Sequence, residues 1–268
     1  MPNVTANGID HHYEQKGSGE PLILIPYLAA DNACYAFQVA DYAKQFTCIS
    51  LDLRGTGESG SSEEPYSTID LAEDIAAVMA ALKIERAHVV GLSLGAAVGM
   101  WLAAKHPERV KSLSLHSSWD RSDAFLKTVV QGWQVMAAGL SDVAGMVIQG
   151  IFPWCFTPEL YAAKPEYIES LAAFVRSRPR QTLEAFILQS GAVIEHDARA
   201  VLASIAAPTQ LTFGRQDMVT STRFAQPLTQ AIQTSELHVF EDCSHAPIYE
   251  NVAAFNEVSL AFLKRHIG

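Results

Sequence analysis

The stretch Gly91-Leu92-Ser93-Leu94-Gly95 lies between an apolar run, residues 88–92, and a helical pattern that Pro107 ends. A serine on such a strand-to-helix turn must adopt a strained backbone, and small neighbouring residues relieve the clashes that result. The turn also presents the hydroxyl at a helix N-terminus, where N–H groups and the helix dipole favour developing negative charge. The alternative is a serine that only caps the helix. We expect Ser93 to be a catalytic nucleophile.

A serine nucleophile needs a positioned base, and the base needs an acid that orients it. Two later apolar strands lead into suitable residues: Asp217 follows the run 208–214, and His245 follows the run 236–240. The chain order Ser, Asp, His suits this kind of strand-turn-helix site, and open α/β sheets bind ligands at the carboxyl ends of their strands. We therefore expect a triad of Ser93, Asp217 and His245. A loop histidine bonded to backbone and an aspartate that only caps a helix are the alternatives.

Two other acids compete for the role of Asp217. Asp120 comes just after the strand that ends near His116, and Asp242 precedes the loop of His245. Asp217 is favoured because it follows its strand directly. His116 also lies near a strand end, where it lines the pocket or serves as a structural histidine.

The strand-like runs are apolar on both faces, which is typical of a parallel sheet covered by helices. Helical patterns alternate with them, as in residues 69–82, and this alternation predicts a right-handed α/β arrangement. Asn7-Gly8 predicts a hairpin at the sheet edge. We expect an α/β fold with a mostly parallel eight-stranded sheet and helices on both faces. Its strands include the runs 21–26, 46–52, 88–92, 110–115, 208–214 and 236–240.

The alternation stops after residue 117. From 119 to 206 helical periodicity continues without a convincing strand, and large apolar side chains are frequent. We expect a core domain formed by residues 1–118 and 207–268, with a helical cap, residues 119–206, inserted after the sixth strand. Most aromatic side chains of the cap should form its own core. The residues expected to line a substrate pocket are Tyr27, Trp133, Phe152 and Trp154.

The composition excludes several classes of protein. The chain has 268 residues and a formal net charge of −10, which disfavours nucleic acid and anionic membranes as partners. No apolar stretch approaches the roughly 20 residues that span a bilayer, and the N-terminus lacks the pattern of a signal peptide. The four cysteines, Cys34, Cys48, Cys155 and Cys243, are too scattered for a zinc site or a disulfide framework. We expect a cytoplasmic monomer or homodimer.

These motifs together resemble the α/β-hydrolase superfamily along almost the whole chain, nearest to its capped esterases and enol-lactone hydrolases. Leu51-Asp52-Leu53-Arg54-Gly55-Thr56-Gly57-Glu58-Ser59 is similar to the family's D-x-R-G-x-G-x-S loop. The resemblance implies an oxyanion hole formed by the backbone N–H groups of Leu28 and Leu94. The chain departs from the family at Pro26-Tyr27, which replaces a His-Gly pair, and at Ala96-Ala97, where Gly-Gly is frequent.

The residues and the resemblance together predict hydrolysis of a carboxylic ester or lactone of a small to medium, partly apolar substrate, without a metal or organic cofactor. Hydrolases of this family that act on haloalkanes or epoxides have an aspartate nucleophile, so Ser93 disfavours both. Hydrolysis of a C–C bond in ring-cleavage products keeps a serine triad and is the main enzymatic alternative, followed by a cofactor-free perhydrolase. A ligand receptor with a vestigial triad is the alternative from another class.

Overall fold

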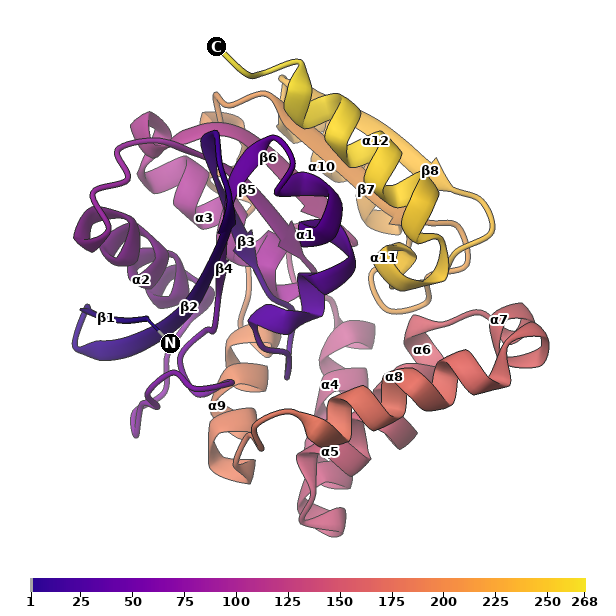
Figure 1. Cartoon of the computed structure of the whole chain (residues 1–268). Coiled ribbons are helices and arrows are strands. Elements are labelled where there is room, and N and C mark those ends of the chain that lie inside the picture. The colour runs from indigo at the N-terminus through magenta and orange to yellow at the C-terminus, as the bar shows by residue number, and fades with distance from the viewer. Residues whose placement is uncertain (1) are drawn as a thin grey trace.

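Eight strands form one sheet in the order β1-β2-β4-β3-β5-β6-β7-β8 in the computed structural model, which describes residues 2–268 (Figure 1). β1 pairs with β2, and β2 with β4, in antiparallel orientation, and all the other neighbouring strands are parallel. The strands are β1 (Asn3–Ala6), β2 (Ile9–Gly17), β3 (Glu20–Ile25), β4 (Phe46–Leu51), β5 (Ala87–Leu92), β6 (Val110–His116), β7 (Thr209–Gly214) and β8 (Ser235–Phe240). The prediction of a mostly parallel, eight-stranded sheet is confirmed.

The first two strands form the hairpin that Asn7-Gly8 predicts. Asn7 has a φ of 50° and Gly8 a φ of 76°, which are the positive values that a tight two-residue hairpin turn requires. The Asn7 side chain also donates to Asp74 at 2.7 Å. This bond ties the edge hairpin to the helix that carries Asp74.

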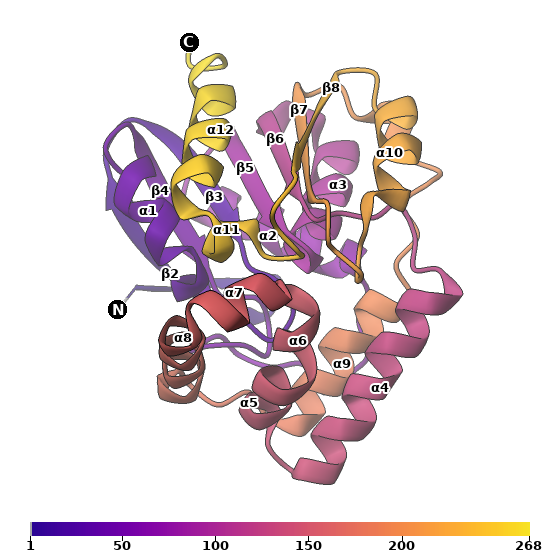
Figure 2. The same ribbon diagram turned by 90° about the vertical axis from the view of Figure 1, so that its right-hand side faces the viewer.

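Helices cover both faces of the sheet (Figure 2). One face is covered by α1 (Ala36–Tyr42) and α12 (Val252–Lys264), and the other by α2 (Thr68–Ala81), α3 (Leu94–Lys105) and α10 (Ala225–Ala231). Helix α2 begins in a capping box, in which Ser67 and Asp70 bond each other's backbone N–H groups. The helices bury the central strands, and every residue of β5 and β7 is buried.

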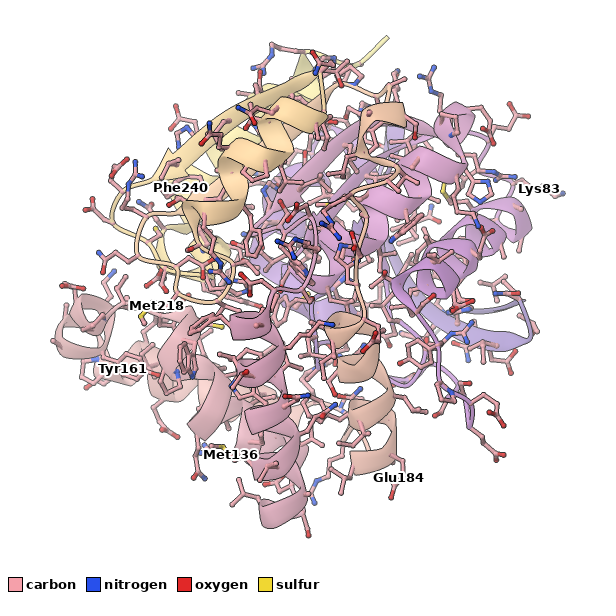
Figure 3. The ribbon with its side chains drawn as sticks, turned by 180° about the vertical axis from the view of Figure 1, so that it is seen from behind. Lys83, Met136, Tyr161, Glu184, Met218 and Phe240 are labelled. Atoms are coloured by element: carbon pink, nitrogen blue, oxygen red, sulfur yellow. The ribbon has the colours of Figure 1, made fainter. Side chains whose placement is uncertain are left out.

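A run of helices, called here the α4–α9 segment (residues 124–194), lies between β6 and β7 in the chain and beyond the carboxyl ends of the parallel strands (Figure 1). Met136 on α4 and Glu184 on α9 lie at its far end from the sheet (Figure 3). Its elements are α4 (Ala124–Leu140), α5 (Val143–Met146), a π-helical turn (Val147–Ile151), α6 (Phe152–Cys155), α7 (Pro158–Ala163), α8 (Pro165–Ser177) and α9 (Leu183–Ile194).

The two ends of the α4–α9 segment are joined to each other by backbone hydrogen bonds. Arg121 and Asp197 form an antiparallel bridge. The Ser122 N–H donates to the His196 carbonyl at 2.9 Å, and the Ala198 N–H donates to the Asp120 carbonyl at 2.8 Å. The chain therefore leaves the sheet and returns to it along one short two-stranded connection.

None of the helices described in residues 2–268 is long and apolar enough to cross a membrane. All four cysteines are free thiols, and three of them, Cys34, Cys48 and Cys243, are buried. Burial raises the pKa of each of these buried thiols, so they stay protonated at neutral pH.

Candidate active site

Ser93 lies on a sharp turn between β5 and α3. Its backbone has a φ of 51° and a ψ of −118°, a combination that residues other than glycine rarely adopt. A Cβ added at Gly91 would lie 2.2 Å from the Gly95 carbonyl oxygen, and one at Gly95 would lie 2.1 Å from the Ile25 carbonyl oxygen. The turn therefore requires glycine on both sides of the serine.

The Ser93 hydroxyl does not cap helix α3. Ser93 is the N-cap residue, yet its side chain forms no capping hydrogen bond in the described structure. The backbone N–H of Ser93 donates to the His116 carbonyl at 2.9 Å, which fixes the turn against the neighbouring strand β6. The side chain itself lines a cavity. The capping alternative thus has no contact to support it.

His245 and Asp217 form a buried pair at the ends of β8 and β7. His245 Nδ1 lies 2.8 Å from Asp217 Oδ2, and both residues are buried. The other carboxylate oxygen of Asp217 accepts the backbone N–H groups of Val219 at 2.7 Å and Thr220 at 3.0 Å. These bonds hold the carboxylate so that it orients the imidazole, which lines the same cavity as Ser93.

Two hydroxyl groups support this pair. Thr220 Oγ1 donates to the Ser117 carbonyl at 2.8 Å and also lies 3.2 Å from His245 Nδ1. Ser117 Oγ in turn donates to the His245 carbonyl at 2.8 Å. Ser117 has a φ of 48°, so the chain after β6 is bent to make these contacts. The sequence offers no signal for either residue, because both lie in ordinary loop sequence far from His245.

The competing acids lie elsewhere. The Asp120 carboxylate accepts the N–H of the next residue, Arg121, at 2.9 Å, and it does not line the cavity in the described structure. Asp242 is exposed. Of the three candidate acids, Asp217 is the one bonded to His245.

A partly buried acid that the sequence did not reveal contacts the loop of His245. The Glu250 carboxylate, in α11 (Pro247–Glu250), accepts the N–H of Ser244 and, at 2.6 Å, the N–H of Thr157. Burial raises the pKa of Glu250, and the hydrogen bonds from Thr157 and Ser244 offset only part of this rise. The Ala246 N–H also donates to the Cys155 carbonyl at 3.1 Å. Ser244 Oγ donates to the Trp154 carbonyl at 3.0 Å, so the residues on both sides of His245 are bonded to the α4–α9 segment.

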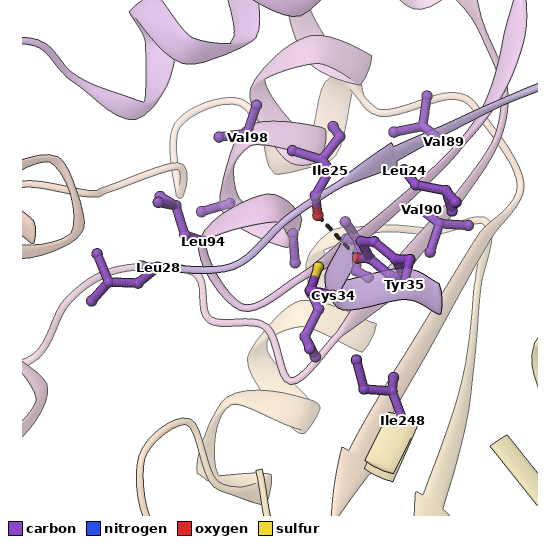
Figure 4. Packing of buried hydrophobic residues seen from close by; sticks show 14 of the residues in the cluster. Leu24, Ile25, Leu28, Cys34, Tyr35, Val89, Val90, Leu94, Val98 and Ile248 are labelled. Carbon is purple, nitrogen blue, oxygen red and sulfur yellow. Dashed lines mark hydrogen bonds between the residues drawn. The ribbon is translucent and has the colours of Figure 1, made fainter. Parts of the chain in front are cut away.

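The loop after β3 brings a free N–H group to the cavity. Leu28 lines the cavity, and its N–H donates to no acceptor within residues 2–268. Figure 4 shows the chain from Ile25 to Leu28 passing Leu94, the first residue of α3. The Leu94 N–H has no helical carbonyl to bond because it lies in the first turn. Among the described residues, neither of the two N–H groups implied by the family resemblance has an acceptor.

Position 27, where the family has glycine and this chain has tyrosine, does not need glycine in this structure. The positive φ occurs two residues later, at Ala29 with 59°, whereas Tyr27 has an ordinary negative φ. The Tyr27 hydroxyl lies 2.9 Å from the Tyr249 hydroxyl, which donates to the Cys34 carbonyl at 2.8 Å. Tyr249 uses its only proton there, so Tyr27 donates to Tyr249.

The cavity beside Ser93 has a volume of about 120 Å³ and is mostly apolar. Of the predicted pocket residues, Tyr27, Trp133 and Phe152 line it. The Trp133 indole N–H donates to the Gly150 carbonyl at 3.0 Å, so its polar atom is satisfied within the α4–α9 segment. Trp154 differs from the expectation, since it is not among the lining residues. Its ring packs edge-on against Phe125, with centroids 6.4 Å apart.

Two other histidines, His116 and His196, lie outside the residues that line the cavity. His116 is fully buried, its Nδ1 lies 2.7 Å from Thr212 Oγ1, and burial lowers its pKa to about 3. It does not line the described cavity, so the structural alternative is the one that its contacts support. His196 is bonded to Thr68 at 2.9 Å, and burial lowers its pKa to about 4. Residues 2–268 contain no cluster of His, Cys, Asp and Glu able to hold a metal ion.

Comparisons with known proteins identify the family of the chain. The model of the α/β hydrolase fold family matches residues 16–252. A relative from Azorhizobium caulinodans, named as a carbamate hydrolase (RutD), is 27% identical, and the match covers 98% of each chain. 3-Oxoadipate enol-lactonase 2 of Acinetobacter baylyi is 29% identical, covering 98% of this chain and 96% of the relative. The crystal structure of the enol-lactonase from Burkholderia xenovorans LB400 superposes with a TM-score of 0.89 at 26% identity, over 98% of this chain and 100% of the other. The chain therefore belongs to the α/β hydrolase fold family.

Proposed function

We propose that the protein hydrolyses a carboxylic ester or lactone with Ser93 as nucleophile, His245 as general base and Asp217 as the orienting acid. One observation carries the proposal. Ser93, held on a strained turn without a capping bond, shares a cavity with a histidine whose Nδ1 is bonded to a buried carboxylate at 2.8 Å. A carboxylate on Nδ1 fixes the tautomer that leaves Nε2 free to accept the serine proton.

The reaction follows from these groups. His245 Nε2 takes the Ser93 proton while Ser93 Oγ attacks the carbonyl carbon, and the N–H groups of Leu28 and Leu94 bind the oxyanion. His245 then protonates the leaving alcohol oxygen, and an acyl-enzyme remains. Water, deprotonated by His245, attacks the acyl-enzyme and releases the carboxylic acid and Ser93. In this mechanism His245 supplies the base and the two N–H groups supply the oxyanion donors, so no step uses a metal or organic cofactor.

The α4–α9 segment acts in this proposal as the cap of the core domain. It supplies much of the apolar wall of the cavity, including Trp133 and Phe152. Apolar walls with few polar groups bind the hydrocarbon part of a ligand. They favour a small to medium, partly apolar acyl or alcohol group. The names of the enol-lactonase relatives support lactones as one class to test.

Labelling with a fluorophosphonate tests the nucleophile. Peptide mapping should find the adduct on Ser93, and Ser93→Ala should abolish labelling, whereas Ser170→Ala on the exposed face of α8 should not. A folded wild-type protein that does not react would refute the assignment.

A substrate panel tests the reaction class. We expect turnover of p-nitrophenyl esters or of lactones, and loss of that turnover by several orders of magnitude in Ser93→Ala and in His245→Ala. Turnover restricted to vinylogous 1,5-diketones would instead show a C–C bond hydrolase. Ligand binding without turnover of any substrate would show a receptor.

A further inference from the structure

Gln189 links helix α9 to the loop that carries the Leu28 N–H. Its side chain is fully buried, and its Oε1 accepts the backbone N–H of Ala29 at 2.9 Å. The two residues are 160 positions apart in the chain. Gln189 does not line the described cavity, so any effect it has on a substrate must pass through the loop.

The orientation of the Gln189 amide is fixed by its neighbours. Gln181 Nε2 donates to Gln189 Oε1 at 3.2 Å and to the Gly55 carbonyl at 3.1 Å. The opposite orientation would place the Gln189 NH₂ group against two donors, the Ala29 N–H and the Gln181 amide. The acceptor therefore faces Ala29, and Gln181 holds it there from the other side.

The hydrogen bond acts on a backbone that would not keep this shape unaided. Ala29 has a φ of 59°, which is unfavourable for a residue with a Cβ. The turn is closed by a second bond, from the Ala30 N–H to the Tyr27 carbonyl at 3.2 Å. The Tyr27 carbonyl belongs to the same planar peptide group as the Leu28 N–H. The two bonds thus fix two consecutive peptide planes, and one of these planes carries the Leu28 donor.

We infer that Gln189 is a positioning residue for the oxyanion hole: its bond to Ala29 holds the Leu28 N–H toward the carbonyl that Ser93 attacks. The inference rests on the proposed hydrolase function. An oxyanion donor interacts more strongly with the transition state than with the substrate, so an error in its position lowers kcat more than it raises KM. A residue that only stabilises the fold would not separate kcat from KM in this way.

The test compares Gln189→Leu with Gln134→Leu. Leucine removes the acceptor at 189 and fills the buried site with an apolar side chain of similar size. Gln134, which is partly exposed, is the control, because its Nε2 donates to Ser190 Oγ on the same helix α9 at 2.8 Å and it does not line the described cavity. Gln189 lies on α9 and Gln134 is bonded to α9, so each variant loses one side-chain amide at this helix.

We expect Gln189→Leu to lower kcat about 10- to 100-fold with KM changed less than about twofold, less than the loss of a whole oxyanion donor. Affinity for a trifluoromethyl ketone, which forms a tetrahedral adduct with serine, should fall by a similar factor, whereas affinity for the product acid should not. Amide hydrogen exchange over residues 26–31 should accelerate in Gln189→Leu alone. Gln134→Leu should resemble the wild type in all three measurements.

Several results would overturn the inference. Equal losses in the two variants, a change confined to KM, or unchanged exchange over residues 26–31 would each show that Gln189 does not position the donor. An active wild type with an unaffected Gln189→Leu variant refutes this inference alone. A wild type that neither turns over esters or lactones nor reacts with a fluorophosphonate refutes the proposed function, and the inference with it.

Discussion

The Glu250 carboxylate accepts the Thr157 N–H at 2.6 Å and thereby joins the turn before α7 to the helix that follows His245. Its other oxygen accepts the N–H of Ser244, next to the histidine. A glutamine at this position would keep one acceptor and set an NH₂ group against the other N–H. The environment of His245 therefore depends on both oxygens of this carboxylate.

We expect Glu250→Gln to lower the free energy of unfolding by about 1–3 kcal/mol, since one buried N–H loses its acceptor. kcat should fall as well, because the loop of His245 loses a contact on one side. Urea unfolding and ester kinetics measure the two effects. Glu257→Gln, at an exposed position of α12, is the control, and an equal loss in both variants would contradict the prediction.

The turn at Ser93 should not tolerate a methyl group at Gly95. In Gly95→Ala the new Cβ would lie 2.1 Å from the Ile25 carbonyl oxygen, so the backbone must move. We expect a loss of several kcal/mol in stability and of most activity. In Gly132→Ala, within α4, the Cβ meets no atom within 4 Å, and stability should rise by roughly 0.5–1 kcal/mol. Thermal unfolding of the two variants should therefore shift in opposite directions.

Substitution of the acids distinguishes the orienting carboxylate. Asp217→Asn replaces the oxygen bonded to His245 Nδ1 with a group that favours the wrong tautomer, and kcat should fall by about 10³- to 10⁴-fold. Asp120→Asn should stay within a few-fold of the wild type, because the Asp120 carboxylate accepts only the neighbouring N–H of Arg121 among the described residues. A larger loss in Asp120→Asn would reassign the acid.

Acid should destabilise the protein through two buried histidines. Burial lowers the pKa of His116 to about 3 and that of His196 to about 4, from an ordinary value of 6.5. The folded state keeps both rings neutral while the unfolded chain binds protons below pH 6.5. The two rings therefore do not reduce the free energy of unfolding above about pH 6.5. As the pH falls toward 4, the unfolded chain binds protons that the folded state does not, and the free energy of unfolding falls by roughly 2 kcal/mol for each ring at pH 5.

Urea unfolding between pH 7.5 and pH 5 measures this dependence. His196→Gln keeps a polar group near Thr68 but removes the titrating ring, so its stability should fall less steeply with acid. His238→Gln, on the edge strand β8 and only partly buried, should keep the wild-type slope. Identical slopes in all three proteins would show that His196 does not titrate as described.

The sequence carries strong local signals for the sheet and for the turn at Ser93. The apolar strands, the Asn7-Gly8 hairpin and the two glycines beside the serine are short-range features. Asp217 and His245 are predicted from chain order together with their places just after two later strands. These residues lie where strand ends meet in any parallel sheet, so their proximity follows from the fold.

The rest of the site depends on contacts between distant segments. The positive φ occurs at Ala29 rather than at Tyr27, and the Ala29 N–H is bonded to Gln189, a partner 160 residues away that leaves no pattern in the local sequence. The Glu250 contact with Thr157 spans 93 residues and leaves no pattern in the sequence. Trp154 is aromatic like the residues that line the pocket, but its ring packs against Phe125. The sequence does not predict this, because the direction of a side chain on a four-residue helix cannot be read from periodicity.

The paired backbone of Arg121 and Asp197 has an evolutionary consequence. A segment of more than seventy residues starts and finishes at one point of the scaffold, so its length and shape can change without altering the register of β6 and β7. Deletions, insertions or a wholesale exchange between relatives would leave the strand ends that carry Asp217 and His245 in place. The contacts of Gln189 and Glu250 limit such an exchange, since a transplanted segment must supply an acceptor for the Ala29 N–H and a donor for the Glu250 carboxylate.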